Sequence, residues 1–234
     1  MLKKAMILAA GFGKRVKPLT QERPKPLLKI GNETLLSNTI KFLKSYGIKK
    51  IVINIHYLAE QIIHYIDKNN FDLDISLVEE KNKILDTGGG ILNAIQHFKN
   101  DPFLIMNPDT IWSSGYLEEI KLMENIFFKK KSKCSLLLVR KDKCHDESLK
   151  GDFNLEKNLN IKRDKNELKY IYTGAQIISP SVFEGLSVSP FSINKIWDEL
   201  IREEELFGVE SQINFLHVST LDIYKKLSEK NFKH

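Results

Sequence analysis

Two glycines and several basic side chains lie together near the start of the chain. Gly11 and Gly13 are followed by Lys14, Arg15 and Lys17. Glycine lets the backbone turn tightly and bring its N–H groups against phosphate oxygens. Fixed cations stabilise the negative charge that grows when a phosphate group is transferred. The segment therefore predicts a loop that binds phosphates.

Two familiar phosphate-binding motifs do not match this loop. A dinucleotide fingerprint requires a third glycine at position 16, which is Val16, and no Gly-Lys-Ser/Thr run follows as a P-loop requires. A further lysine, Lys25, lies between Pro24 and Pro26. Because proline fixes its own φ and restricts the residue before it, we expect Lys25 to be held on a stiff, extended segment.

The elements that must position these groups alternate between strands and helices in the first half of the chain. Buried strands are predicted at 5–9, 51–53, 73–78 and 102–106. Apolar residues at helical spacing predict helices between them, and Gly47 is expected to end the first. This alternation is typical of a parallel sheet covered by helices. The glycine-rich loop would then follow the carboxyl end of the first strand, where such sheets bind ligands.

The second half of the chain has a different pattern. A helix is predicted over 116–128, a strand over 134–139 and a charged connection without regular structure over 141–150. Short antiparallel strands are predicted at 151–155, 159–161 and 169–178, followed by a helix around Trp197. The last predicted elements are a strand at 213–218 and a helix capped by Thr220.

The expected architecture is an α/β fold with three layers, Rossmann-like, with a mixed central sheet and a small β-rich insertion. A length of 234 residues suits one domain over 1–234. Within it we expect two functional halves, residues 1–110 and residues 111–234. The sequence leaves a monomer and a homodimer open.

Composition is typical of an ordinary globular protein. Hydrophobic residues make up 42% and charged residues 28% of the chain, and the net charge is +6. Most lysines are scattered; the tight run at 129–133 follows a predicted helix, where cations complement the helix dipole. We therefore expect no nucleic-acid partner. No apolar run is long enough for a membrane span or a signal peptide, and two cysteines form no disulfide or metal pattern, so we expect no membrane partner and a cytoplasmic location.

The motifs taken together resemble the sugar-phosphate nucleotidyltransferase family. The resemblance rests on Leu8–Arg15 and Pro24–Leu28 and continues through Asp86–Gly90, Asn107–Asp109, Gly151–Phe153, Tyr172–Gly174 and Leu216–Thr220. It covers nearly the whole chain and is greatest to the short bacterial N-acetylmuramate α-1-phosphate uridylyltransferases. The resemblance implies transfer of a nucleoside monophosphate from an NTP, expected to be UTP, to a sugar 1-phosphate, with release of pyrophosphate.

The resemblance also implies roles for individual residues. Arg15 and Lys25 would be catalytic, and Asp152 and Gly174, with Asn107, would bind the sugar. The implied nucleotide-binding set is Ala10, Gly11, Gly13, Lys14, Arg15, Lys25, Glu80 and Gly88. Alternatives stay open at several positions: Glu80 also suits a surface charge, Trp112 or Trp197 suits either sugar stacking or the core, and His56, in Asn54-Ile55-His56, suits a structural hydrogen bond.

A divalent metal is the implied cofactor. A carboxylate after a strand suits Mg²⁺, and the resemblance makes Asp109 a metal ligand. Relatives carry a second aspartate where this chain has His217. Imidazole is a poor ligand for Mg²⁺ and a better one for Mn²⁺ or Co²⁺. His217 would therefore bind a softer ion directly, or hold a metal-bound water or phosphate oxygen beside Asp109, or mark an inactive relative.

Two rival functions follow from the same residues. A mannose- or heptose-1-phosphate guanylyltransferase would need the same cations and metal, because few residues decide the sugar and the base. A non-catalytic sugar-nucleotide-binding module would share the fold, since fold does not fix function. The presence of Arg15, Lys25 and Asp109 favours an enzyme.

Overall fold

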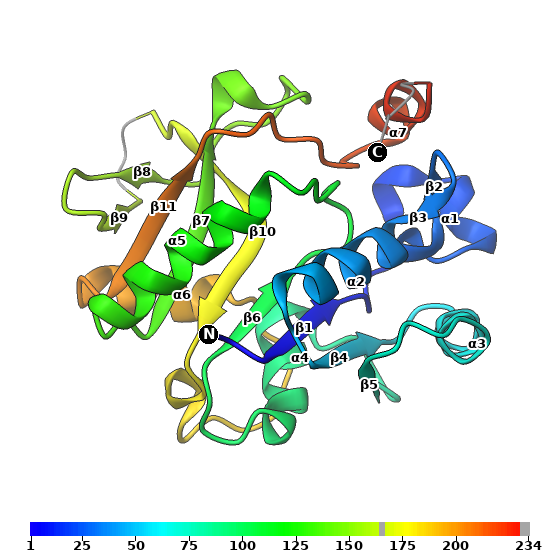
Figure 1. Ribbon diagram of the computed structural model, residues 1–234, viewed down its shortest axis with the longest axis horizontal. Helices are drawn as coiled ribbons and strands as arrows, with labels where there is room; N and C mark the ends of the chain where they lie inside the picture. The colour runs from blue at the N-terminus through cyan, green and yellow to red at the C-terminus, as the bar shows by residue number, and fades with distance from the viewer. Residues whose placement is uncertain (164–166, 230–234) are drawn as a thin grey trace.

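A seven-stranded sheet forms the centre of the molecule (Figure 1). The computed structural model describes residues 1–163 and 167–229. The strand order is β11-β7-β10-β6-β1-β4-β5. The strands are β1 (Lys4–Leu8), β4 (Lys50–Ile55), β5 (Asp74–Glu79), β6 (Phe103–Met106), β7 (Cys134–Arg140), β10 (Tyr170–Ile178) and β11 (Leu206–Ser211).

The sheet is mixed, as the sequence predicts. Strands β5, β4, β1 and β6 are parallel neighbours. Strand β10 runs antiparallel to both β6 and β7, and β11 is parallel to β7. The predicted strand at 169–178 is therefore a nine-residue element inside the main sheet and not part of a small insertion. The parallel half and the antiparallel half meet where β6 pairs with β10.

Helices cover both faces of the sheet, which gives the three predicted layers (Figure 1). Side chains alternate across β1: Ala5 and Ile7 pack in one apolar cluster and Met6 in the other. The first cluster contains side chains of α2 (Leu35–Tyr46), α3 (Ala59–Lys68) and α5 (Tyr116–Lys129). The second contains side chains of α4 (Asp86–Ala94) and α6 (Asn194–Arg202).

Helix α2 begins and ends as its sequence indicates. The Thr34 side chain accepts a hydrogen bond from the Ser37 N–H at 3.0 Å, which satisfies one of the free donors of the first turn. Gly47 follows the last turn with φ of 99°, a conformation that a side chain would disfavour. The predicted stop at Gly47 is confirmed.

Short elements complete the fold. Helix α1 (Leu19–Glu22) and two 3-10 turns (Lys14–Val16 and Lys25–Leu27) lie in the segment after β1. Strands β2 (Lys29–Ile30) and β3 (Glu33–Thr34) form one hairpin, and β8 (Asn154–Leu155) and β9 (Ile161–Lys162) form another. The β8–β9 pair is the small β-rich insertion. Helix α7 (Leu221–Ser228) is capped by Thr220, as predicted. The remaining 3-10 turns span Ile95–His97, Lys141–Lys143 and Pro180–Phe183.

The predicted strand at 213–218 is wrong. Its apolar residues make only isolated bridges, from His217 to Thr110 and from Phe215 to Cys144. The true last strand, β11, begins after an acidic run and contains Gly208, so its sequence carries little strand signal. Gly208 packs closely there, because an added Cβ would lie 2.8 Å from Leu155 Cδ1 of the insertion and would make that side chain shift. Long-range packing therefore selects this strand over the more apolar segment that follows.

The connection over 141–150 is also more ordered than predicted. It contains the 3-10 turn Lys141–Lys143, and the N–H of His145 donates to the Phe215 carbonyl at 3.0 Å. Cys134 and Cys144 are free and buried. Over the described residues, none of the helices has both the length and the apolar character that crossing a membrane requires.

Candidate active site

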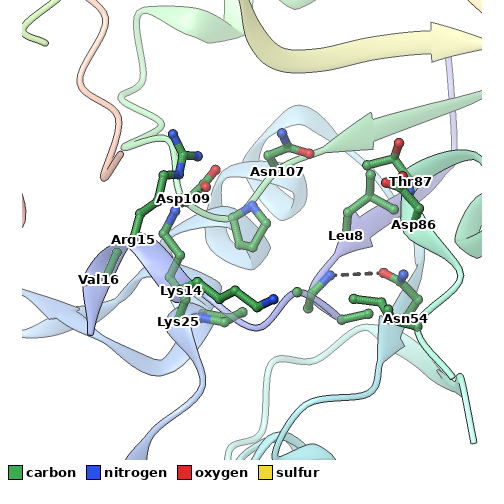
Figure 2. Close-up of a pocket in the computed structure, with 17 residues that line it drawn as sticks. Leu8, Lys14, Arg15, Val16, Lys25, Asn54, Asp86, Thr87, Asn107 and Asp109 are labelled. Carbon is green, nitrogen blue, oxygen red and sulfur yellow. Dashed lines mark hydrogen bonds and ion pairs between the residues drawn. The ribbon is translucent and has the colours of Figure 1, made fainter. Parts of the chain in front are cut away.

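A pocket of about 330 Å³ lies where β1 and β6 end side by side (Figure 2). Strand β1 lies inside the parallel half of the sheet. The loops that follow it and its neighbour leave a crevice at the carboxyl ends of the strands. The lining includes the loop after β1, the Lys25 segment, the first turn of α4 and the residues after β6. Eight of the predicted site residues line it: Ala10, Gly11, Gly13, Lys14, Arg15, Lys25, Asn107 and Asp109.

The two loop glycines differ in what they allow. Gly13 has φ of 62°, and an added Cβ would lie 2.8 Å from Thr20 Cγ2 and 3.1 Å from Lys25 Cβ. Its carbonyl also accepts a hydrogen bond from the Thr20 hydroxyl at 2.9 Å. An added Cβ at Gly11 would meet nothing within 4 Å. Gly13 therefore packs the loop against the Lys25 segment, whereas Gly11 borders open space in the pocket.

Cations gather at one end of the pocket (Figure 2). Arg15 and Lys25 lie beside Asp109, and Lys25 Nζ donates to Asp109 Oδ2 at 2.5 Å. Lys14 Nζ lies 5.4 Å from the centre of the Phe12 ring, which holds its side chain by a cation–π contact. The sequence placed these three cations together, and the fold confirms that they share one pocket.

Asp109 is held as a carboxylate between two basic groups. His217 Nε2 lies 3.2 Å from the same Oδ2 atom that accepts from Lys25. Burial alone would raise the pKa of Asp109, but the charges of Lys25 and His217 and their hydrogen bonds outweigh it and hold that pKa well below its usual range. The arrangement keeps a negative charge fixed at the cationic end.

The backbone sets the contact between Asp109 and His217. The Val218 N–H donates to the Asp109 carbonyl at 2.8 Å, and the Ile111 N–H donates to the Leu216 carbonyl at 2.9 Å. The Phe215 ring stacks on the His217 ring, with centres 5.5 Å apart and planes 15° apart. The segment before α7 therefore brings His217 to Asp109, although that segment is not a strand.

The donor set at Asp109 fits a divalent cation. Asp109 Oδ1 and His217 Nδ1 are buried and make no hydrogen bond with the described part of the chain. Over residues 1–163 and 167–229, no group of three or more His, Cys, Asp or Glu side chains is placed to hold a metal. The protein thus offers a carboxylate and an imidazole, and oxygens from a substrate would have to complete the coordination.

Glu80 and Asn54 form a buried pair at the pocket, which Asn54 lines. Asn54 Oδ1 accepts from the Ala9 N–H at 3.0 Å, the dashed contact in Figure 2, and Asn54 Nδ2 donates to Glu80 Oε1 at 2.7 Å. Glu80 Oε2 accepts from the Leu85 N–H at 2.7 Å, and Glu80 is only 2% exposed. Both carboxylate oxygens thus support the end of β1 and the approach to α4. His56 Nδ1 lies 2.6 Å from the Glu80 carbonyl, which is the structural hydrogen bond.

The three glycines of α4 allow close packing. A Cβ at Gly88 would lie 2.3 Å from Phe191 Cε2, and the Gly88 N–H donates to the Phe191 carbonyl at 2.9 Å. A Cβ at Gly89 would lie 2.2 Å from the Ser189 carbonyl oxygen, and one at Gly90 would lie 2.7 Å from Glu80 Oε1. The glycines open the first turn of α4 and do not precede the helix. Gly88 is not among the lining residues, so its nucleotide contact stays a prediction.

The predicted sugar-binding residues lie around the junction of β6 and β10. Gly174 has φ of 93°, and its carbonyl accepts from the Asn107 N–H at 2.8 Å. Asp152 Oδ2 accepts from the Tyr172 N–H at 2.9 Å. Of these residues Asn107 lines the pocket, and Asp152 and Gly174 do not.

Neither tryptophan is open to a sugar ring. Trp112 is 3% exposed and its Nε1–H donates to the Asn107 carbonyl at 3.0 Å. Trp197 is 4% exposed and donates to Gln176 Oε1 at 3.0 Å. Both belong to the core, and Trp112 supports Asn107 from behind.

The two lining residues that begin α4 were not among the predicted site residues. Asp86 and Thr87 lie at the end of the pocket opposite the cations (Figure 2). Asp86 has φ of 59°, uncommon for a residue with a side chain. The sequence signal for these two residues is their position directly before the glycine run.

Known proteins of similar sequence are sugar-phosphate nucleotidyltransferases. The family model described as nucleotidyl transferase matches residues 4–146. N-acetylmuramate α-1-phosphate uridylyltransferase from Neisseria meningitidis serogroup B is 30% identical, covering 93% of this chain and 94% of the relative. The protein of the same name from Caulobacter vibrioides is 26% identical, covering 92% and 90%. A probable mannose-1-phosphate guanylyltransferase from Oryza sativa is 27% identical, covering 88% of this chain but 58% of its own.

Solved structures share the fold. HddC from Yersinia pseudotuberculosis in complex with GMP-PN superposes with a TM-score of 0.78 at 24% identity, covering 97% of this chain and 99% of that chain. The family model also matches more than half of the chain. This chain is a member of the nucleotidyl transferase family, an enzyme of the sugar-1-phosphate nucleotidyltransferase type.

Proposed function

We propose that the protein transfers uridine monophosphate from UTP to N-acetylmuramate α-1-phosphate and releases pyrophosphate. The proposal rests on the sequence identity to the relatives and on the share of each relative's length that this chain matches. The chain matches nine-tenths or more of both uridylyltransferases but 58% of the rice guanylyltransferase, and we therefore take the proposed substrates from the relatives that it matches over nearly their whole length. The cationic end of the pocket supports the chemistry, and the relatives support the choice of substrates.

The reaction needs no nucleophile from the protein. An oxygen of the sugar 1-phosphate attacks the α-phosphorus of UTP, and the bond to the β-phosphate oxygen breaks, so pyrophosphate leaves with its electrons. The attacking oxygen is already anionic, so no base is required. Lys25 and Arg15 would neutralise the charge on the α-phosphate and the leaving group. The carboxylate of Asp109 orients Lys25 through the 2.5 Å contact.

Asp109 and His217 would hold the divalent cation, which we propose to be Mg²⁺. The unpaired, buried Oδ1 atom of Asp109 supports direct ligation, and His217 would hold a metal-bound water or a phosphate oxygen. When bound, the ion supplies charge neutralisation at the phosphates. Mn²⁺ or Co²⁺ would replace Mg²⁺ if His217 were a direct ligand.

The two halves of the chain would divide the substrates. Residues 1–110 supply the loop, Lys25 and Asp109, and we assign the nucleotide to them; Glu80, predicted to bind the nucleotide, is buried and only supports the end of β1. Residues 111–234 supply Asp152 and Gly174 near Asn107, and we assign the sugar to that side. Asp86, opposite the cations, lies where a base would reach if the phosphates occupy the cationic end.

Guanylyl transfer is the second candidate. The matching structure of HddC was solved with GMP-PN, and the rice relative acts on mannose 1-phosphate by its name. The cationic end of the pocket would serve GTP equally, because it contacts phosphates and not the base.

Pyrophosphate release over a grid of NTPs and sugar 1-phosphates separates these functions. We expect the highest kcat/KM with UTP and N-acetylmuramate α-1-phosphate. Faster turnover of GTP with mannose 1-phosphate or a heptose 1-phosphate would replace the proposal with the second candidate. Binding of substrates without pyrophosphate release under any metal would leave a non-catalytic module.

A further inference from the structure

A series of hydrogen bonds joins two lining residues of the pocket, Thr87 and Asn107, through the second half of the protein. Thr87 lines the pocket, and its Oγ1 accepts from the N–H of Ile193 at 2.9 Å. The next residue, Asn194, accepts from Arg163 Nη2 at 2.8 Å. Arg163 Nε in turn donates to the Asp152 carbonyl at 3.4 Å.

The series of hydrogen bonds continues from Asp152 back to the pocket lining. Asp152 Oδ2 accepts from the Tyr172 N–H, two residues before Gly174, whose carbonyl accepts from the N–H of the lining residue Asn107. These contacts define an acceptor wall on the side of β10 and α6. Its members are Thr87, Asn107, Asp152, Arg163, Tyr172 and Asn194.

Arg163 is held firmly within this wall. Its Nη1 donates to Asp198 Oδ1 at 2.6 Å, and its guanidinium carbon lies 4.6 Å from the centre of the Phe153 ring. The side chain nevertheless remains 28% exposed, and Asp198 is 53% exposed. A guanidinium has five N–H groups, so the three contacts leave one N–H on each terminal nitrogen without a partner among the described residues. Arg163 is therefore fixed in place and still able to bind.

Arg163 is also the sole cation among the six members of the wall. Lys14, Arg15 and Lys25 lie at the cationic end of the pocket, which is called the phosphate end below. A neutral hexose offers no negative charge with which a cation on the sugar side could pair. N-acetylmuramate differs from N-acetylglucosamine by a lactyl ether that carries a carboxylate. Arginine is the side chain best suited to a carboxylate, because its planar N–H groups match the two oxygens.

We propose that Arg163 binds the lactyl carboxylate of the acceptor and thereby selects a carboxylate-bearing sugar 1-phosphate over its neutral counterpart. The inference rests on the proposed function, because it concerns the acceptor of that reaction. Asp198 shares the guanidinium and partly neutralises it. Removing the charge of Asp198 should therefore strengthen binding of the anionic sugar, and removing that of Arg163 should weaken it.

The test compares two sugars in matched variants. KM is measured with UTP for N-acetylmuramate 1-phosphate, and KM or the inhibition constant for N-acetylglucosamine 1-phosphate, in Arg163→Gln, Asp198→Asn and Lys162→Gln. Lys162 is the control because it is the neighbouring cation and pairs with Glu204 outside the wall. Thermal melting checks that each variant is folded.

In Arg163→Gln we expect the muramate KM to rise about 10–100-fold, the usual effect of losing a charge-assisted hydrogen bond. The constant for the neutral sugar should change less than about threefold. Asp198→Asn should lower the muramate KM alone, and this variant keeps the test valid if Arg163→Gln does not fold. Lys162→Gln should change neither.

Two results would overturn the inference while leaving the proposed function intact. One is an equal change for both sugars in Arg163→Gln, which indicates a purely structural arginine. The other is an unchanged muramate KM in both Arg163→Gln and Asp198→Asn. A wild-type enzyme that does not use N-acetylmuramate 1-phosphate would overturn the proposed function itself, and the inference with it.

Discussion

The phosphate end of the pocket and the acceptor wall are built in different ways. The phosphate end comes from two short segments close in sequence, the loop after β1 and the Pro24–Pro26 turn, together with Asp109. The acceptor wall collects Thr87, Arg163 and Asn194 with residues of β10, which are far apart along the chain. On the proposed function, the first region would neutralise charge that every NTP carries. The second would surround the part of the acceptor that differs between enzymes.

This difference predicts which substitutions affect all substrates and which affect only some. Changes at the phosphate end should lower turnover with every NTP and sugar, because each reaction develops the same charge. Changes in the acceptor wall should alter the ranking of sugars.

The largest expected effect is at Asp109. In Asp109→Asn the carboxylate that contacts Lys25 and His217 is lost, and we expect pyrophosphate release to fall by about 10³-fold or more with every substrate pair. Asp101→Asn, which changes an exposed partner of Lys4, is the matched control. Activity within tenfold of the wild type in folded Asp109→Asn would remove Asp109 from the metal site.

The next effect concerns the cations. Lys25→Ala and Arg15→Ala should each lower kcat by about 10²–10³-fold, the usual cost of one transition-state donor. Lys44→Ala, an exposed lysine paired with Asp72, should leave kcat unchanged. If either variant raised KM for one sugar while kcat stayed within threefold, the proposed division between the two regions would fail.

The two loop glycines offer a smaller test by stability. In Gly13→Ala the added Cβ would be 2.8 Å from Thr20 Cγ2 at a positive φ, so we expect a loss of about 1–3 kcal/mol. Thermal unfolding would then shift down by several degrees. In Gly11→Ala the added Cβ has open space, so the free energy of unfolding should stay within about 0.5 kcal/mol of the wild-type value. A raised KM for the NTP in Gly11→Ala would be the sign that the nucleotide occupies that space. Equal melting temperatures for the two variants would contradict the assignment of Gly13.

The smallest effect is expected at His217. His217→Asp should keep its Mg²⁺-dependent activity, and the Mg²⁺ concentration for half-maximal rate should fall by up to about tenfold, because a carboxylate suits this ion better than imidazole. Titration of the rate with Mg²⁺ and Mn²⁺ measures this. A wild-type enzyme that is silent with Mg²⁺ and active with Mn²⁺ would show that His217 is itself a ligand.

The phosphate end was predictable from sequence because its signals are local. Gly13, Lys14 and Arg15 follow a buried strand, and Lys25 is close to them in sequence. Lys25 begins the 3-10 turn Lys25–Leu27, so the extended conformation predicted from its two flanking prolines is wrong. Partners across the sheet were not predictable. Glu80 suited a surface charge or a base contact, yet the fold buries it against Asn54 and Leu85. The glycines of α4 suited a nucleobase, yet the segment at 189–191 packs on them.

The fold divides in the same way. Alternating apolar runs predicted the parallel half, where each strand is followed by a helix that covers it. The second half failed at its last strand, because β11 is selected by pairing with β7 and by the contact of Gly208 with the insertion. Arg163 gave no signal, since its partners Asp198 and Asn194 lie more than thirty residues away in sequence.

A single competition reaction tests the central claim most directly. UTP and GTP at equal concentration are mixed with the enzyme, Mg²⁺ and the 1-phosphates of N-acetylmuramate, N-acetylglucosamine and mannose. The products are identified and quantified by mass spectrometry during the first few per cent of turnover. We expect UDP-N-acetylmuramate to be the dominant product. A dominant GDP-sugar, or UDP-N-acetylglucosamine in excess over UDP-N-acetylmuramate, would contradict it.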